Sequence, residues 1–168
     1  MTIAYPSHDR LVECVRYNPL SGIFTCREHQ PKSRFYPGDV LGSLISSGYL
    51  QVYIDGVSYL AHRLAWLHET GSVTENDIDH RDLVKTHNWF SNLREATRRQ
   101  NIQNQGVKAT NTSGFKGVSF SKQKGKFEAR IRANGRRIHL GFFDLPEDAG
   151  AAYEAAATQL HGGFAYGG

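Results

Sequence analysis

The sequence predicts an α+β protein built from two small units, in each of which an antiparallel sheet is accompanied by helices. The length of 168 residues fits one ordinary domain or two small ones. Short runs of β-forming residues alternate with glycine-containing turns in both halves of the chain, and amphipathic helical patterns flank them. The hydrophobic content of 39% and the 17 glycines are typical of a turn-rich globular protein.

The N-terminal half begins with a predicted helix over residues 8–17, which the Asn18-Pro19 turn ends. A second helix is predicted over residues 60–69, where leucines recur at helical spacing, and a third over residues 92–104. Brief β-forming runs predict a small antiparallel sheet, and Asp55-Gly56 is typical of a hairpin turn. These runs cover residues 22–26, 40–44, 49–54 and 57–59.

The polar, nonperiodic residues 105–114 predict a boundary between two domains. We expect a first domain over 1–104, a linker over 105–111 and a second domain over 112–168. Three strands are predicted in the second domain, over residues 116–120, 126–133 and 136–143, and Asn134-Gly135 joins the last two. A helix should follow, capped by Asp144 and Glu147. It carries a stripe of mostly small residues that allows close packing on the sheet: Ala149, Ala152, Tyr153, Ala156, Ala157 and Leu160.

Positive charge is concentrated in residues 93–140, which hold twelve basic and two acidic residues although the whole chain carries only +4. Such a segment favours a nucleic-acid or other anionic partner, and a solvated charged face is the alternative. No run of about 18 apolar residues and no apolar signal core is present, so we expect a soluble intracellular protein. Cys14 and Cys26 show no metal-binding spacing, and we expect both to be reduced core residues.

Residues 78–94 contain polar side chains in an order that suits a one-metal phosphodiesterase site. The carboxylate of Asp79 and the amide oxygen of Asn92 are hard donors suited to Mg²⁺. His80 has the ordinary pKa of a base that accepts a proton from water near neutral pH. The structural alternative is that Asn88 braces a turn and Asn92 caps a helix.

The sequences IDH, HN, SNLREAT and RRQNIQN in residues 78–104, preceded by GYLQVYIDGVSYLAHRLAW, resemble the HNH homing endonucleases of phages and introns. The resemblance covers about residues 10–104 and implies the ββα-metal fold and metal-dependent hydrolysis of DNA. It implies one divalent metal, Mg²⁺ or alternatively Mn²⁺, on Asp79 and Asn92. His80 would then be the general base and Asn88 the residue that orients it.

Two further histidines enter this interpretation. His87 stands where many relatives have an asparagine, which makes it a weaker candidate for phosphate contact. His62 is a catalytic candidate that faces the cleft, and the alternative is a histidine that is simply hydrogen-bonded on a half-buried helix.

The C-terminal segments SGFKGV, FEARIR and RIHLGFF resemble the plant ethylene-response-factor or Apetala-two type of DNA-binding domain over residues 112–166. That resemblance implies a three-stranded sheet in the major groove. It implies DNA contacts from Lys116, Lys126, Arg132 and Arg137, and the charged face of the predicted strand adds Arg130. His139 is also a candidate DNA contact, because it is placed where the family commonly has a contacting tryptophan. This departure means that a sequence preference is not inherited.

The expected function is therefore that of a metal-dependent endonuclease acting on double-stranded DNA, with no membrane or small-molecule cofactor, in the cytoplasm of a bacterial or phage-infected cell. The main alternative is a noncatalytic, sequence-specific DNA-binding regulator derived from such a nuclease. RNA binding ranks last, because the aromatic residues mostly alternate inward. The target sequence, the number of strands cut and the oligomeric state stay open.

Overall fold

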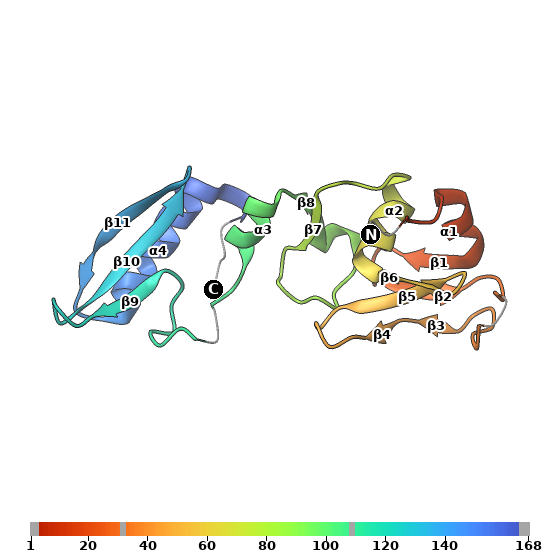
Figure 1. Ribbon diagram of the computed structural model, residues 1–168, viewed down its shortest axis with the longest axis horizontal. Coiled ribbons are helices and arrows are strands. Elements are labelled where there is room, and N and C mark those ends of the chain that lie inside the picture. Colours follow the sequence, from red (N-terminus) through yellow and green to blue (C-terminus); the bar gives the residue numbers. More distant parts are fainter. Residues whose placement is uncertain (1–3, 31–32, 108–109, 165–168) are drawn as a thin grey trace. The chain divides into compact units, whose positions relative to one another are not determined.

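The computed structural model describes residues 4–30, 33–107 and 110–164, and its internal contacts divide the chain into two units, Met1–Thr97 and Arg98–Gly168 (Figure 1). The domain boundaries expected from the sequence stay a prediction, and residues 108–109 of the expected linker lie outside the described residues. None of the helices in the described ranges has the length and apolar character required to cross a bilayer.

The first unit opens with a short helix that turns directly into a strand. Ser7 caps this helix by accepting a hydrogen bond from the Arg10 amide. The predicted helix over 8–17 is therefore too long, because Val15 to Asn18 pair with the next strand. The elements are α1 (His8–Cys14), β1 (Val15–Asn18), β2 (Ile23–Cys26) and β3 (Val40–Leu41), and the sheet order is β1-β2-β3.

A second antiparallel sheet follows in the same unit, so the single sheet predicted from residues 22–59 is wrong. The predicted strand over 40–44 is split at Gly42 between the two sheets. The helix predicted over 60–69 is confirmed with a shift of one residue. The elements are β4 (Ser43–Leu44), β5 (Leu50–Ile54), β6 (Val57–Leu60) and α2 (Ala61–Thr70), and the sheet order is β4-β5-β6.

The segment after α2 forms a two-stranded ladder joined by a loop. Strand β7 (Asp77–His80) pairs with β8 (Leu93–Ala96), and the short 3₁₀ helix η1 (Phe90–Asn92) leads into β8. The helix predicted over 92–104 is thus wrong for its first half, because residues 93–96 form ladder pairs with β7. Only α3 (Arg98–Asn104), which begins the second unit, is helical.

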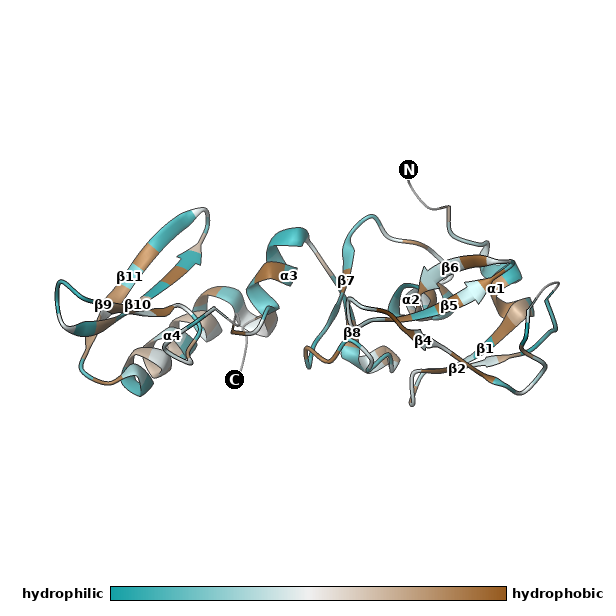
Figure 2. Ribbon diagram, turned by 60° about the horizontal axis from the view of Figure 1, so that its bottom comes forward, coloured by the Kyte–Doolittle hydropathy of each residue, from teal (hydrophilic) through white to brown (hydrophobic). Residues whose placement is uncertain are grey.

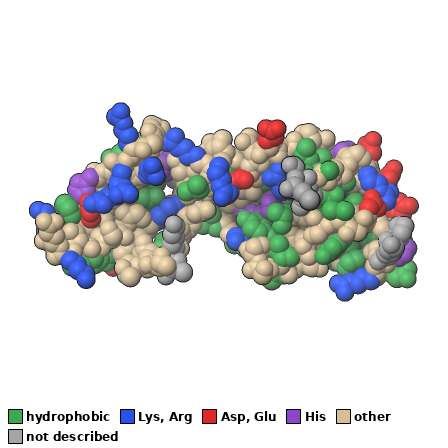
Figure 3. Space-filling view, viewed as in Figure 1, with side chains coloured by type: hydrophobic (Ala, Val, Ile, Leu, Met, Phe, Trp, Pro, Cys, Tyr) green, Lys and Arg blue, Asp and Glu red, His purple; other side chains and the backbone are tan. Residues whose placement is uncertain are grey.

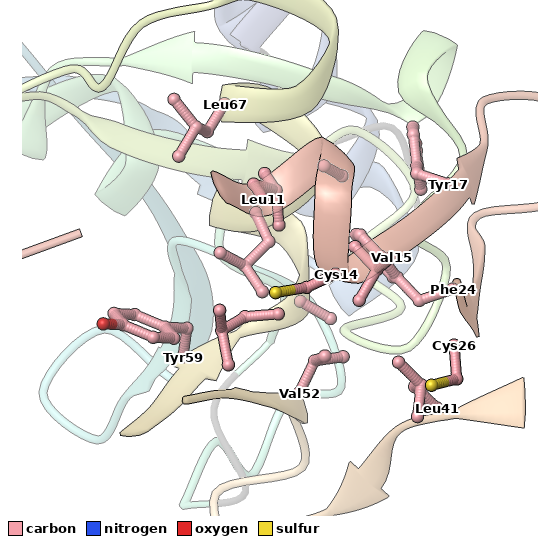
Figure 4. Packing of buried hydrophobic residues seen from close by; sticks show 14 of the residues in the cluster. Leu11, Cys14, Val15, Tyr17, Phe24, Cys26, Leu41, Val52, Tyr59 and Leu67 are labelled. Atoms are coloured by element: carbon pink, nitrogen blue, oxygen red, sulfur yellow. The ribbon is translucent and has the colours of Figure 1, made fainter. Parts of the chain in front are cut away.

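The core of the first unit lies between α1, α2 and the sheets (Figure 4). Leu11, Val15 and Phe24 are nearly inaccessible to solvent, and Leu64 of α2 packs into the same cluster. Burial of such side chains is the main stabilising contribution to a fold of this size. Cys14 and Cys26 are buried free thiols within this cluster, as predicted.

The second unit is a three-stranded antiparallel sheet covered by one long helix. Apolar and polar residues alternate along β10, and Figure 2 shows brown and teal bands on β10 and β11. The Asn134-Gly135 hairpin and both of its strands are confirmed to the residue. The elements are β9 (Val118–Ser121), β10 (Lys126–Ala133), β11 (Arg136–Phe143), α4 (Pro146–His161) and the 3₁₀ turn η2 (Gly162–Phe164), and the sheet order is β11-β10-β9.

The helix α4 packs on the sheet through its small residues. Ala149, Tyr153 and Ala157 are buried in two apolar clusters with residues of β9 and β10, as the stripe predicted, whereas Leu160 is exposed. The predicted capping box is wrong. Leu145 is the N-cap residue, and the carboxylate of Asp144 pairs with Lys126 at 3.0 Å.

We expect Gly22→Ala to destabilise the first unit by more than Gly56→Ala. Both glycines have a positive φ, which costs an alanine about 1–2 kcal/mol. A Cβ at Gly22 would also lie 2.4 Å from the Asn88 carbonyl carbon and the Trp89 nitrogen, whereas a Cβ at Gly56 meets nothing within 4 Å. Urea denaturation of both variants measures the difference, and equal losses of unfolding free energy would contradict this close approach.

Candidate active site

The loop that joins β7 to β8, residues 81–92, is fixed against the first unit at its centre. The hydroxyl of Tyr17 donates to the Asn88 carbonyl at 2.6 Å, and the Phe90 amide donates to the Pro19 carbonyl at 2.8 Å. Gly22 approaches the same stretch so closely that no side chain fits there. The loop is therefore held in one conformation by groups far away in the sequence.

This loop carries Asn88 to the side chain of His80 at the end of β7. The Nε2 atom of His80 lies 3.0 Å from Oδ1 of Asn88, and both residues are buried. The Asn88 amide also donates through Nδ2 to the Thr86 carbonyl at 3.3 Å. Because a carbonyl only accepts, this contact assigns Oδ1 to the His80 side, and Nε2 must carry the proton. A neutral His80 therefore has its basic lone pair on Nδ1.

Two aromatic rings pack against His80. The ring of His62, from α2, lies 5.1 Å from the His80 ring between centroids, and Tyr49 lies 5.0 Å from His62 and 6.0 Å from His80. His62 is 5% exposed, and its Nδ1 has no hydrogen-bond partner among the described residues. The cleft-facing position expected for His62 is thus a buried contact with His80.

Burial sets the protonation of both histidines. Desolvation lowers the pKa of His80 below its ordinary value, and the hydrogen bond that His80 donates to Asn88 opposes this only in part. Desolvation also lowers the pKa of His62 to about 3, with smaller contributions from the neighbouring His80 and Arg63. Both imidazoles are therefore neutral near pH 7, which is the form a general base requires.

Asp79, the residue before His80, lies in a different environment. It is buried and directly opposite Arg94 in the β7–β8 ladder. Its Oδ2 atom is 2.9 Å from Nε and 2.8 Å from Nη2 of the guanidinium. A buried carboxylate needs such a partner, because an uncompensated charge would be strongly unfavourable there.

Asn92 ties the two ends of the loop together. Its Oδ1 accepts from the Asp82 amide at 3.1 Å, and its Nδ2 donates to the Asp82 carboxylate at 2.9 Å and to the His87 carbonyl at 2.8 Å. Asp82 also contacts Nδ1 of His87 at 2.6 Å. Burial alone would raise the pKa of Asp82, but the hydrogen bonds from His87 and Asn92 outweigh burial and lower it. The helix-cap alternative for Asn92 is replaced by this bracing of the loop.

Asp79 and Asn92 carry oxygen atoms of the type that a hard divalent cation accepts as ligands. Among the described residues, no cluster of three or more His, Cys, Asp or Glu side chains has the spacing of a complete protein cage. Mg²⁺ is typically held by one or two carboxylates together with water and substrate phosphate, and does not require such a cage. Asp79 supplies a carboxylate, and the Oδ1 atom of Asn92 has a second lone pair besides the one that accepts from Asp82.

The residues expected to contact DNA fall into three groups in the second unit. Arg130 faces His139 across the β10–β11 ladder, and Arg132 faces Arg137. These four side chains are exposed on the sheet face that α4 does not cover. Lys126, the first residue of the central strand β10, is paired with Asp144. Figure 3 shows Lys and Arg side chains in blue over this unit, with few acidic ones in red.

Lys116 does not share that face. It precedes β9, and its ammonium donates to the main-chain carbonyls of Gln103, at 2.6 Å, and of Gln105. Burial lowers the pKa of Lys116 to about 8. The structure therefore gives Lys116 a bracing role within its unit, in place of the expected position on the sheet.

Sequence reasoning missed two residues of the site. Arg94 follows from the β7–β8 register, which was hidden because residues 93–96 were assigned to a helix. Tyr49 is brought to the site by the sheet β4-β5-β6, and no pattern in the sequence connects it with His80.

We expect the stability of the first unit to fall as the pH falls below about 6.5, in part because of His62. The unfolded chain binds the proton first, since the pKa of His62 is lower in the folded state. For a folded pKa of about 3, His62 alone removes about 2 kcal/mol between pH 7 and pH 5. Urea denaturation of His62→Gln should show a shallower pH dependence, and exposed His29→Gln is the control. Parallel curves for wild type and His62→Gln would contradict the burial of a neutral imidazole.

The HNH endonuclease family model matches residues 59–103, which contain α2, β7, the loop and β8. Protein 3.8 of Escherichia phage T7 is 34% identical over 88 residues, which are 52% of this chain and 72% of that protein. Among solved structures, one of the HNH homing endonuclease I-HmuI has a TM-score of 0.43 and 18% identity, over 88% of this chain and 84% of that one.

The chain is also similar to plant proteins over a short stretch. An AP2/ERF and B3 domain-containing transcription factor of Arabidopsis thaliana is 45% identical over 51 residues, which are 30% of this chain and 14% of that protein. The similarity to the plant proteins therefore concerns one short segment of each. From the match of residues 59–103 to the family model and the similarity to the phage protein over 72% of its length, the chain belongs to the HNH endonuclease family.

Proposed function

We propose that this protein is a metal-dependent DNA endonuclease in which His80 is the general base. One observation carries the proposal: the buried contact between Nε2 of His80 and Oδ1 of Asn88 at 3.0 Å. The contact of Asn88 Nδ2 with the Thr86 carbonyl determines that His80 donates this hydrogen bond and Asn88 accepts it. A base in hydrolysis must be unprotonated, oriented and close to the attacking water. Asn88 orients the ring and leaves Nδ1 as the atom that accepts the proton.

The surroundings of His80 favour this role over a structural one. Here the burial of the ring, the contact with His62 and the lowered pKa all favour the neutral form near pH 7. We assign His62 the role of a neutral neighbour that keeps the His80 ring in place.

HNH nucleases generally use a divalent metal, and we propose Mg²⁺ or Mn²⁺ held by Asp79 and Asn92. A bound cation of this kind stabilises negative charge on the leaving oxygen of the phosphodiester. In this proposal Arg94 holds the carboxylate of Asp79 in place, and Asp82 holds the amide of Asn92. His87, bound to Asp82, is retained as a candidate for phosphate contact.

We propose that the second unit binds the DNA duplex through the exposed face of its sheet. Arg132 and Arg137 lie directly opposite each other, an arrangement of like charges that is unfavourable until an anion lies between them. Phosphate oxygens accept hydrogen bonds from arginine in the required geometry. Arg130, His139 and Lys126 extend the same surface. The phage relative supports the cytoplasm of a bacterial or phage-infected cell as the place of action.

A noncatalytic DNA-binding protein is the second candidate, and one feature favours it. Asp79 is already paired with Arg94, and Asn92 with Asp82, so the loop is closed by contacts within the protein itself. A former nuclease with this loop would keep its fold without cleaving DNA. The two candidates differ in one property, cleavage that depends on a divalent cation.

Incubation with supercoiled plasmid and Mg²⁺ should give nicked or linear DNA, and His80→Ala should lower the rate by a factor of about 10² to 10⁴, the usual contribution of a general base. DNA affinity measured in EDTA should change little, because His80 is buried in the first unit. Exposed His29→Ala is the matched control for loss of an imidazole.

Chelation of the metal should stop cleavage by the wild type. Asp79→Asn should require a higher Mg²⁺ concentration or show no cleavage, while far-UV circular dichroism checks its fold. Cleavage by His80→Ala at the wild-type rate would remove His80 as the base. DNA binding without cleavage by the wild type under any divalent cation would favour the noncatalytic candidate.

Arg132→Ala with Arg137→Ala should weaken duplex binding and flatten its salt dependence. Each lost phosphate contact removes about 0.9 from the slope of log affinity against log salt, so the slope should change by about 2. Fluorescence anisotropy in EDTA measures this, and the exposed pair Arg16→Ala with Arg27→Ala removes the same charge from the first unit. An unchanged slope in the Arg132 and Arg137 variant would place the DNA on another surface.

A further inference from the structure

A buried carboxylate lies on the outer face of the C-terminal sheet, among the basic residues. Glu128 alternates with the inward-facing Phe127 and Ala129, so its side chain belongs to the same face as Arg130 and Arg132. Its side chain is nevertheless only 9% exposed, whereas those of Arg130 and His139 are 45% and 47% exposed. The two exposed residues cover the carboxylate.

Both covering residues bind one oxygen of Glu128. Nε of Arg130 donates to Oε1 at 2.6 Å, and Nδ1 of His139 lies 2.9 Å from the same atom. Phe142, which faces Glu128 across the ladder, contacts the His139 ring at 4.8 Å between centroids. The acid, the arginine and the histidine therefore form one connected group.

A bulge in the sheet makes this group possible. Ala129 pairs with Gly141 but Arg130 pairs with His139, so Leu140 is an extra residue in β11. Without the extra residue, His139 and Phe142 would point to opposite faces, because side chains alternate along a strand. The bulge brings both to the outer face beside Glu128.

The contacts with Glu128 determine what the two exposed side chains offer to a ligand. Since a carboxylate accepts, Nδ1 of His139 carries a proton, and in its neutral form the ring presents Nε2 as an acceptor. Nε of Arg130 is used by Glu128, and among the described residues its two Nη groups have no partner. The group presents a pair of donors from Arg130 next to one acceptor from His139.

This pattern is complementary to one base pair in the major groove. Guanine offers two acceptors, N7 and O6, which arginine contacts with two donors, and cytosine offers the N4 amino group as a donor beside them. We propose that Glu128 is a positioning residue that fixes Arg130 and His139 as a reader of a G·C base pair. The proposal rests on DNA binding by the second unit and adds a base preference to it.

Fixing Arg130 and His139 before DNA binds also favours discrimination between base pairs. An arginine that is already fixed loses less conformational freedom when it binds a base edge. A mismatched base then meets donors and an acceptor that cannot turn away to find other partners. Glu128 therefore acts on the choice of sequence more than on the strength of binding, which phosphate contacts dominate.

The test selects duplexes from a randomised library with the whole protein in EDTA and sequences those retained. The wild type should fix at least one position as G·C, with roughly tenfold or greater loss of affinity when that pair is replaced. Arg130→Ala and His139→Ala should each lose the preference at that same base pair. Glu128→Ala should lose it too, while affinity for random duplex changes by no more than a few fold.

Two variants keep the outcome interpretable. Glu128→Gln retains an acceptor of the same length, and should recover part of the preference. Glu154→Ala removes an exposed acid from α4, and should leave the preference unchanged. Circular dichroism and thermal unfolding check that Glu128→Ala folds; if it does not, Glu128→Gln, Arg130→Ala and His139→Ala carry the comparison.

The possible failures are distinguishable. A wild-type preference that Glu128→Ala leaves intact, a fixed A·T pair contacted by Arg130 and His139, or effects of these two residues at different positions would overturn the inference. Binding of duplex DNA without any fixed position would also overturn it, and would leave the DNA-binding function standing. A wild-type protein that binds no duplex would overturn the function proposed above, and this inference with it.

Discussion

The hydrogen bond between His80 and Asn88 is the interaction on which the catalytic interpretation depends, and the first unit is arranged to hold it. Asn88 is 1% exposed, and its main chain is fixed by the Tyr17 hydroxyl and by the close approach of Gly22. The side chain is fixed in turn by the Thr86 carbonyl. The hairpin of β1 and β2 therefore has a function beyond its contribution to the core, since it sets the position of the residue that orients the base.

Much of the fold follows from local sequence, and the failures have a common cause. The β10–β11 hairpin was predicted to the residue because period-two alternation and Asn134-Gly135 are local signals. Strand β8 was predicted as a helix because Leu, Arg, Glu and Ala all favour helices. Its pairing with β7 depends on residues about fifteen positions earlier, and a short window does not contain that information. The pairing of β8 with β7 therefore outweighed the helix propensity of its residues.

The site shows the same division. The candidate residues around His80 could be chosen from the sequence, because the family resemblance places them in one short segment. The residues that contact them could not be identified in this way. Tyr49 and His62 reach His80 from a sheet and a helix that precede the motif, and Arg94 reaches Asp79 only through the ladder register. Lys116 was misplaced for the opposite reason, since a basic residue in a basic segment gives no sign that carbonyl groups bind its ammonium. Charge alone did not distinguish it from Arg132.

The most direct test of the account is the tautomer of His80 in solution. Long-range ¹H–¹⁵N correlation spectra of histidine-labelled protein distinguish the two neutral forms and the imidazolium, and loss of one signal set in His80→Gln assigns it. The account predicts a neutral ring at pH 7 with the proton on Nε2. A proton on Nδ1, or a doubly protonated ring at that pH, would contradict it, because neither form leaves the oriented base that hydrolysis requires.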